Sequence, residues 1–130
     1  MNRYKQREQA LLLIFESLFT EREPNELIDV YTENIEEVGD YSKQLFLGVF
    51  EKKDELDNII SEFSTGWKLS RISKVNLAVL RLALYEITYV DDVPESVAIN
   101  EAVELTKKYA SKEDAAFVNG ILGSYFRSRN

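Results

Sequence analysis

The apolar residues of this chain recur with a helical period almost from end to end, and few residues interrupt them. Apolar positions fall three, four and seven residues apart in most windows, which places them on one face of an α-helix. The 130 residues include only two prolines and five glycines. No stretch alternates polar and apolar residues for long enough to predict a strand. The pattern predicts an all-α fold of six or seven helices joined by short connections.

Local signals indicate where these helices begin and end. Pro24 is typical of a first helical turn, and Gly39 of the residue that follows a helix. Asp40 is a suitable N-cap, and Ser111 followed by Asp114 resembles a capping box. The segment 75–90 is apolar nearly all round, which predicts a central helix. We expect helices over residues 3–19, 24–38, 40–63, 67–72, 75–90, 94–110 and from 111 onward.

The chain contains neither cysteine nor histidine. Their absence excludes thiolate nucleophiles, disulfides, imidazole or thiolate zinc sites, and the most common general base near neutral pH. A dinuclear carboxylate bundle would need Glu-x-x-His pairs, and the five glycines are not spaced like a phosphate-binding loop. We therefore expect no enzyme, no cofactor and no metal site.

The apolar segments are too short or too interrupted for a membrane protein. The unbroken run from Ala10 to Phe15 is too short for a signal peptide, and no segment approaches the roughly 20 residues that span a bilayer. Because single cores take roughly 100–150 residues, we expect one domain over residues 1–130. We also expect a cytoplasmic protein that has no membrane partner.

The charges are unevenly distributed along the chain. The 16 basic and 23 acidic residues give a net charge of −7, which for the whole chain disfavours a nucleic-acid partner. Residues 20–62, however, carry four basic and thirteen acidic side chains, whereas residues 63–130 carry nine and eight. Residues 63–85 contain four basic residues and no acid. Since nucleic-acid affinity depends on local basic density, a phosphate-binding face remains compatible with this sequence.

Two further patterns predict packing. Arg81 and Glu86 lie within the most apolar helix, so we expect them to be partly buried and paired, because an isolated buried charge is costly. Ala116, Gly120 and Gly123 lie four and three residues apart in the last helix. This stripe of small residues predicts that another helix approaches closely there.

Four ordered blocks resemble the NusB family of bacterial transcription antitermination factors. The blocks cover residues 66–72, 79–86, 93–105 and 117–122, and Arg7-Glu8 ahead of Ala10 fits the family's first helix. The resemblance implies two small helical bundles packed across each other in one compact helical domain. It also implies binding of the boxA element of ribosomal RNA operon leader transcripts, jointly with the ribosomal protein NusE, in the RNA polymerase antitermination complex. Such a complex suppresses premature termination.

The resemblance also implies the RNA-binding residues. The basic start of the first helix contacts RNA in the family, which here corresponds to Arg3, Lys5 and Arg7. If the helix begins at residue 3, Arg3 and Arg7 lie one turn apart on the same face. Glu113 occupies a position where an acid limits RNA affinity in relatives. Phe117 either stacks on an unpaired base or belongs to the core.

Phe15, Lys74 and Asn76 correspond to the region that meets NusE in relatives, although Phe15 could equally belong to the core. The family often has an acid at the position of Asn76, so a salt bridge expected there is absent. A monomer or a weak homodimer is compatible with the sequence. Two alternatives remain: a protein scaffold of the same fold with weak or no RNA binding, and the helical module of some ribosomal RNA cytosine methyltransferases. The length of 130 residues argues against the second.

Overall fold

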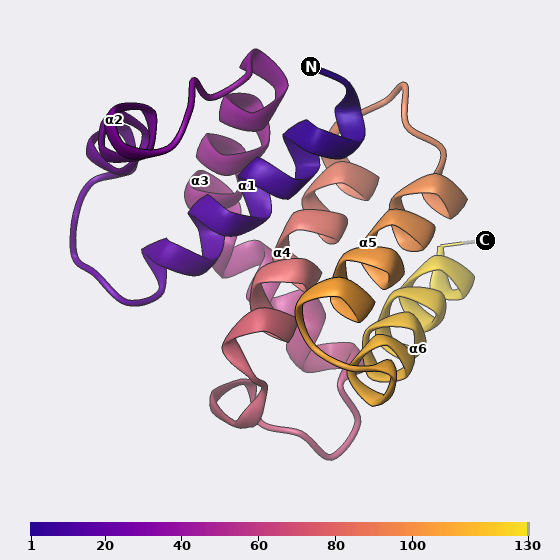
Figure 1. Ribbon diagram of the computed structural model, residues 1–130. Coiled ribbons are helices and arrows are strands. Elements are labelled where there is room, and N and C mark those ends of the chain that lie inside the picture. Colours follow the sequence, from indigo (N-terminus) through magenta and orange to yellow (C-terminus); the bar gives the residue numbers. More distant parts are fainter. Residues whose placement is uncertain (130) are drawn as a thin grey trace.

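The computed structural model describes residues 1–129, which form an all-α fold (Figure 1). The predicted fold class is confirmed, and the segment expected to be a short helix over residues 67–72 contains a single 3₁₀ turn. The elements are α1 (Arg3–Ser17), α2 (Pro24–Asn34), α3 (Asp40–Phe63), the 3₁₀ helix η1 (Leu69–Arg71), α4 (Lys74–Tyr89), α5 (Glu95–Tyr109) and α6 (Lys112–Ser128).

Helix α4 lies at the centre of the molecule, as its sequence predicts. It packs against α1, α3, α5 and α6, so it joins the first three helices to the last two (Figure 1). Ala78, Leu80 and Leu84 on α4 are fully buried. No helix among the described residues is both long enough and apolar enough to cross a membrane.

The helix termini follow the sequence signals closely, with small shifts. Ser111 caps α6 as predicted, because its Oγ accepts a hydrogen bond from the backbone N–H of Asp114 at 3.0 Å. Helix α3 is capped by Gly39 rather than by Asp40, which is instead the first residue of the helix. An acid in a first turn still interacts favourably with the positive end of the helix dipole.

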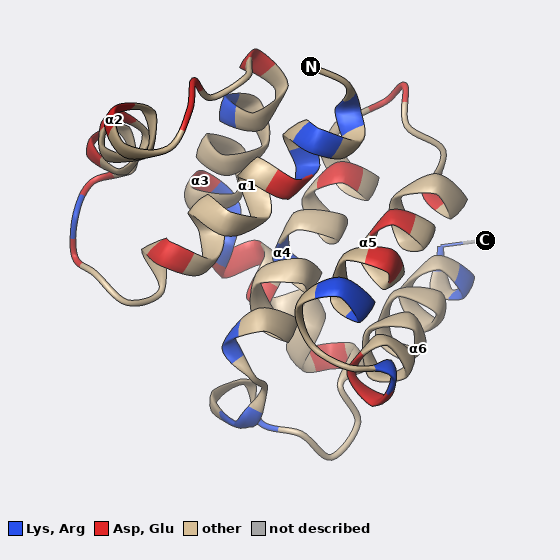
Figure 2. Ribbon diagram, viewed as in Figure 1, with Lys and Arg blue, Asp and Glu red and all other residues tan. Residues whose placement is uncertain are grey.

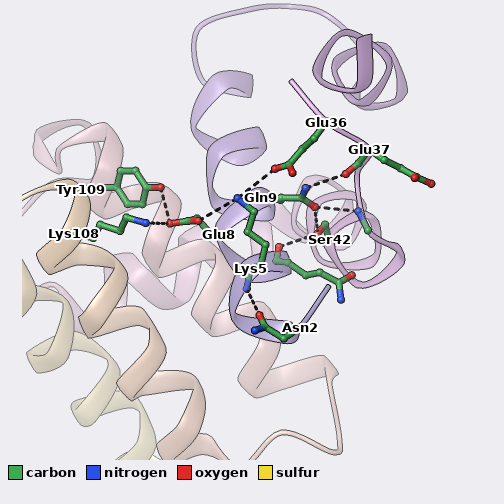
Figure 3. Close-up of polar contacts among 11 residues, drawn as sticks. Asn2, Lys5, Glu8, Gln9, Glu36, Glu37, Ser42, Lys108 and Tyr109 are labelled. Carbon is green, nitrogen blue, oxygen red and sulfur yellow. Dashed lines mark hydrogen bonds and ion pairs between the residues drawn. The ribbon is translucent and has the colours of Figure 1, made fainter. Parts of the chain in front are cut away.

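Helix α2 ends at Asn34, four residues before the predicted end. The following segment is instead held by the fully buried side chain of Gln9 on α1 (Figure 3). Its Nε2 donates to the carbonyl of Glu37 at 3.0 Å, and its Oε1 accepts from the N–H of Gly39 at 3.0 Å. These two bonds satisfy backbone groups that a longer helix would have used internally, so the linker does not need to be helical.

Arg81 and Glu86 of α4 are both paired, as predicted. Arg81 donates from Nε and Nη2 to the two carboxylate oxygens of Asp57 on α3, at 2.8 and 2.7 Å. Glu86 accepts from Arg7 on α1. Each of these charges is therefore compensated by an opposite charge on a neighbouring helix.

The predicted close approach at the small residues of α6 is wrong. Ala116 and Gly120 are exposed, and a Cβ added to Gly120 would meet nothing within 4 Å. At Gly123 it would meet only the end of an arginine side chain from the same helix. Helix α6 packs through the opposite face, which carries the fully buried Val118 and Leu122. The stripe of small residues therefore faces solvent.

Candidate nucleic-acid interface

The first turn of α1 presents Arg3 to solvent over an aromatic ring. The guanidinium carbon lies 4.2 Å from the centroid of the Tyr41 ring, in cation–π contact. Nη2 and Nη1 of Arg3 donate to the two carboxylate oxygens of Asp92 at 3.1 and 3.4 Å. Arginine is always protonated in proteins, and this hydrogen bonding raises the pKa of Arg3 further. Its side chain is nevertheless 43% exposed.

Lys5 lies on the same turn and is also exposed and paired (Figure 3). Its Nζ lies 3.3 Å from a carboxylate oxygen of Glu36 and 3.7 Å from one of Glu8. A lysine is charged at neutral pH, and hydrogen bonding to Glu36 raises the pKa of Lys5 further. The start of α1 thus carries two accessible cations, each in contact with an acid from elsewhere in the chain.

Arg7 is buried, which argues against the expectation that it contacts RNA. Its side chain is only 7% exposed, and Nε donates to both carboxylate oxygens of Glu86 at 3.0 and 2.7 Å. The Tyr41 hydroxyl donates to the same carboxylate, and burial together with this bond raises the pKa of Tyr41. Arg3 and Arg7 do lie on one face as predicted, since both guanidinium groups approach the Tyr41 ring. Arg7 therefore forms a buried ion pair between α1 and α4.

Lys108, at the end of α5, extends the basic surface beside α1. Its Nζ and the Tyr109 hydroxyl both donate to the buried carboxylate of Glu8 (Figure 3). Burial alone would raise the pKa of Glu8, but the bonds from Lys108 and Tyr109 outweigh it, so the pKa lies below its usual value. The run Lys107-Lys108 is visible in the sequence, but its contact with α1 is not, because 100 residues separate the partners.

A second part of the candidate interface lies where α6 begins. Glu113 is exposed in the first turn of α6, and Phe117 is half-buried one turn later. The Phe117 ring contacts the ring of Trp67 edge to face, with centroids 5.9 Å apart, and Trp67 is 54% exposed. An open cavity of about 260 Å³ lies between these residues and the start of α4. Phe117 thus lies at the rim of a cavity, in contact with an exposed aromatic side chain.

The residues assigned to a protein partner do not form one cluster. Asn76 lies in the cavity beside Phe117 and is 4% exposed; its Nδ2 donates to Asp114 Oδ1 at 2.9 Å. Lys74 is the exposed first residue of α4. Phe15 is half-buried and lines a different space, a groove of about 580 Å³ between α1 and α2. Asn76 therefore belongs with Phe117, and Phe15 with the groove.

Basic and acidic residues are unevenly distributed, although both signs occur on most helices (Figure 2). Basic residues mark the start of α1, the end of α5 and the segment that leads into α4, whereas acidic residues dominate α2. The start of α6 lies at the opposite end of the molecule from the start of α1, and the end of α5 lies between them (Figure 1). The basic positions could therefore follow an extended strand of nucleic acid, because phosphate contacts need cations in succession along the backbone.

Comparison with known proteins identifies the family. Residues 4–127 match the model of the NusB family. The chain belongs to the NusB family. A transcription antitermination protein NusB from Acetivibrio thermocellus is 47% identical, over 95% of this chain and 87% of the relative. One from Clostridium novyi is 39% identical, over 98% of this chain and the whole relative.

Solved structures of NusB proteins share the fold. The Thermotoga maritima NusB structure aligns with a TM-score of 0.85 and 29% identity, and covers 95% of this chain and 89% of that chain. A crystal structure of antitermination factors NusB and NusE in complex with double-stranded RNA aligns with a TM-score of 0.84 and 27% identity, over 98% and 99% of the two chains. The NusB-like fold inferred from the resemblance is thus confirmed.

Proposed function

We propose that this protein is a non-enzymatic transcription antitermination factor. In this proposal it binds the boxA element of ribosomal RNA operon leader transcripts together with the ribosomal protein NusE. The complex then suppresses premature termination by RNA polymerase, in the cytoplasm. The observation that carries the proposal is the match over 98% of the chain to a NusB protein described in complex with NusE and double-stranded RNA.

The RNA-binding role is proposed for side chains at the start of α1, at the end of α5 and at the start of α6. Arg3, Lys5 and Lys108 would bind phosphates, because each places a permanent charge at the surface. Phe117 would stack on an unpaired base at the cavity rim, a contact typically worth about 1–3 kcal/mol. Glu113, exposed on the same rim, would repel phosphates and limit the affinity.

NusE is proposed to contact the apolar groove between α1 and α2 and the exposed start of α4. Phe15 offers NusE a half-buried aromatic side chain in an apolar groove, and Lys74 an exposed charge. Asn76 reaches only the cavity beside Phe117, so it would meet whichever partner enters that cavity. The factor would act as a monomer or a weak homodimer before it joins the polymerase complex.

Filter binding tests the proposal directly. A boxA RNA and a scrambled RNA of equal length are compared at two salt concentrations, with and without the NusE partner. We expect the boxA RNA to bind more tightly, and most clearly with NusE present. Equal affinity for both RNAs under all conditions would refute sequence-specific recognition.

A substitution at Arg3 tests the interface itself. We expect Arg3→Ala to weaken binding and to reduce the salt slope of log K by up to about 0.7, the value for one complete contact to single-stranded nucleic acid. Arg22→Ala, tested without NusE because Arg22 lines the groove that contains Phe15, is the matched control: Arg22 is an exposed arginine that pairs with Glu26 in the acidic region. Equal effects of the two substitutions would exclude a specific role for Arg3.

One observation favours a second candidate function, that of a protein scaffold. Arg3, Lys5 and Arg7 are all paired with acids inside the chain, which leaves fewer free charges for RNA than the sequence suggests. A pull-down in which NusE is retained while neither RNA binds would favour the scaffold.

A further inference from the structure

The two exposed cations on the first turn of α1 are each held by an acid from a different connection. Asp92, in the loop between α4 and α5, accepts hydrogen bonds from both terminal nitrogens of Arg3. Glu36, in the linker between α2 and α3, forms an ion pair with the ammonium group of Lys5. A phosphate would need the same donors, since a guanidinium binds carboxylate and phosphate through the same paired N–H groups.

We propose that Asp92 and Glu36 are intramolecular competitors for RNA phosphates at Arg3 and Lys5, and thereby set the RNA affinity of this face. The inference rests on the proposed RNA binding and adds residues that restrain it. RNA would bind in exchange for these two acids. Tyr41 keeps the Arg3 guanidinium in place during the exchange, because its ring lies beneath the cation and its hydroxyl is fixed on buried Glu86.

The exposure of the Asp92 contact argues against a mainly structural role. The Asp92 side chain is 70% exposed, and pairs between exposed charges contribute little to stability. Such a pair is weak enough for a phosphate to displace it. It still lowers affinity, because it neutralises the cation and places a negative charge beside the incoming phosphate.

The chain itself provides matched controls for both acids. Asp91 precedes Asp92 and Glu37 follows Glu36, and both neighbours are exposed. Within the described residues, neither neighbouring carboxylate holds a cation. Asp91→Asn and Glu37→Gln therefore change the net charge equally and leave the Arg3 and Lys5 contacts intact.

The test measures binding of the full chain to boxA RNA by filter binding over a range of salt concentrations. We expect Asp92→Asn to bind about two- to five-fold more tightly than Asp91→Asn, the range given by an exposed pair. The salt slope should also steepen, because Arg3 no longer exchanges an internal carboxylate for the phosphate. Glu36→Gln should likewise bind boxA RNA more tightly than Glu37→Gln does.

A second background shows whether Asp92 acts through Arg3. In Arg3→Ala protein, we expect Asp92→Asn and Asp91→Asn to bind equally, because the cation for which Asp92 competes is gone. The proposal would be overturned if the two variants still differ in Arg3→Ala protein, or if they bind equally when Arg3 is present. So would unfolding of Asp92→Asn in a thermal melt, because the carboxylate would then be structural.

The controls also separate this inference from the proposed function. Wild-type protein that prefers boxA RNA, together with an Asp92→Asn variant that matches Asp91→Asn, overturns only the competitor role. Wild-type protein that binds neither RNA, even with NusE, overturns both.

Discussion

Replacing Arg7 by alanine should destabilise the fold strongly, although the sequence suggests a surface role for this residue. Glu86, with a side chain only 2% exposed, would keep a single partner, the Tyr41 hydroxyl. Breaking a buried ion pair by removing one partner costs about 3–5 kcal/mol. A domain of this kind has about 5–15 kcal/mol in total. Arg7→Ala should therefore remove a large part of the free energy of unfolding.

Urea unfolding followed by circular dichroism measures this loss. With a slope of about 1–3 kcal/mol per molar urea, the midpoint should fall by at least about 1 M. Arg22→Ala removes an exposed arginine and should change the midpoint little. If Arg7→Ala loses less than about 1 kcal/mol, the burial argument is refuted.

A combined variant separates charge from volume. Arg7→Met with Tyr41→Phe and Glu86→Leu removes the whole polar cluster, and substitution of buried ion pairs by apolar residues is often neutral or stabilising. We expect this variant to recover most of the stability lost in Arg7→Ala. No recovery would mean that the shape of Arg7, rather than the stranded charge of Glu86, causes the loss.

The remaining predictions concern two glycines and one buried acid. Gly120→Ala should raise the free energy of unfolding by about 0.5–1 kcal/mol, because the site is open and alanine favours the helix. Gly48→Ala should lower it by about 1–3 kcal/mol, because the new Cβ would lie 2.1 Å from the Tyr85 ring; urea midpoints check both, and equal shifts would contradict the packing described. Folding lowers the pKa of Glu8, so its stabilising effect is present above the ordinary value of 4.5 and is lost as the pH falls below it. The stability gap between wild type and Glu8→Gln should shrink in acid, and a constant gap from pH 7 downward would exclude this linkage.

The sequence predicts what local interactions decide. The helical period, the Ser111 cap and the central position of α4 follow from neighbouring residues, and the structure confirms them. The end of α2 is not predictable in this way, because the side chain that holds the linker, Gln9, lies 28 residues earlier. The stripe at Gly120 is compatible with either a close contact or an open surface, and only tertiary packing distinguishes the two.

The candidate interface is predictable only in part for the same reason. Position in the first helix singles out Arg3 and Arg7 equally, yet one is exposed and the other buried. The difference comes from Glu86, 79 residues away in sequence. Asp92 gives no signal at all, because an acid in a loop acquires its role from the cation that the fold places beside it.

The polar pairs between the first three helices and the last three make the two halves of the chain dependent on each other. Arg7 pairs with Glu86 and Asp57 with Arg81, and each pair joins one half to the other. A cut in the exposed turn at Gly66 would leave each fragment with charges whose counter-ions belong to the other fragment. Separate fragments should therefore remain unfolded and acquire structure only when mixed, because each half supplies the counter-ions that the other needs to fold.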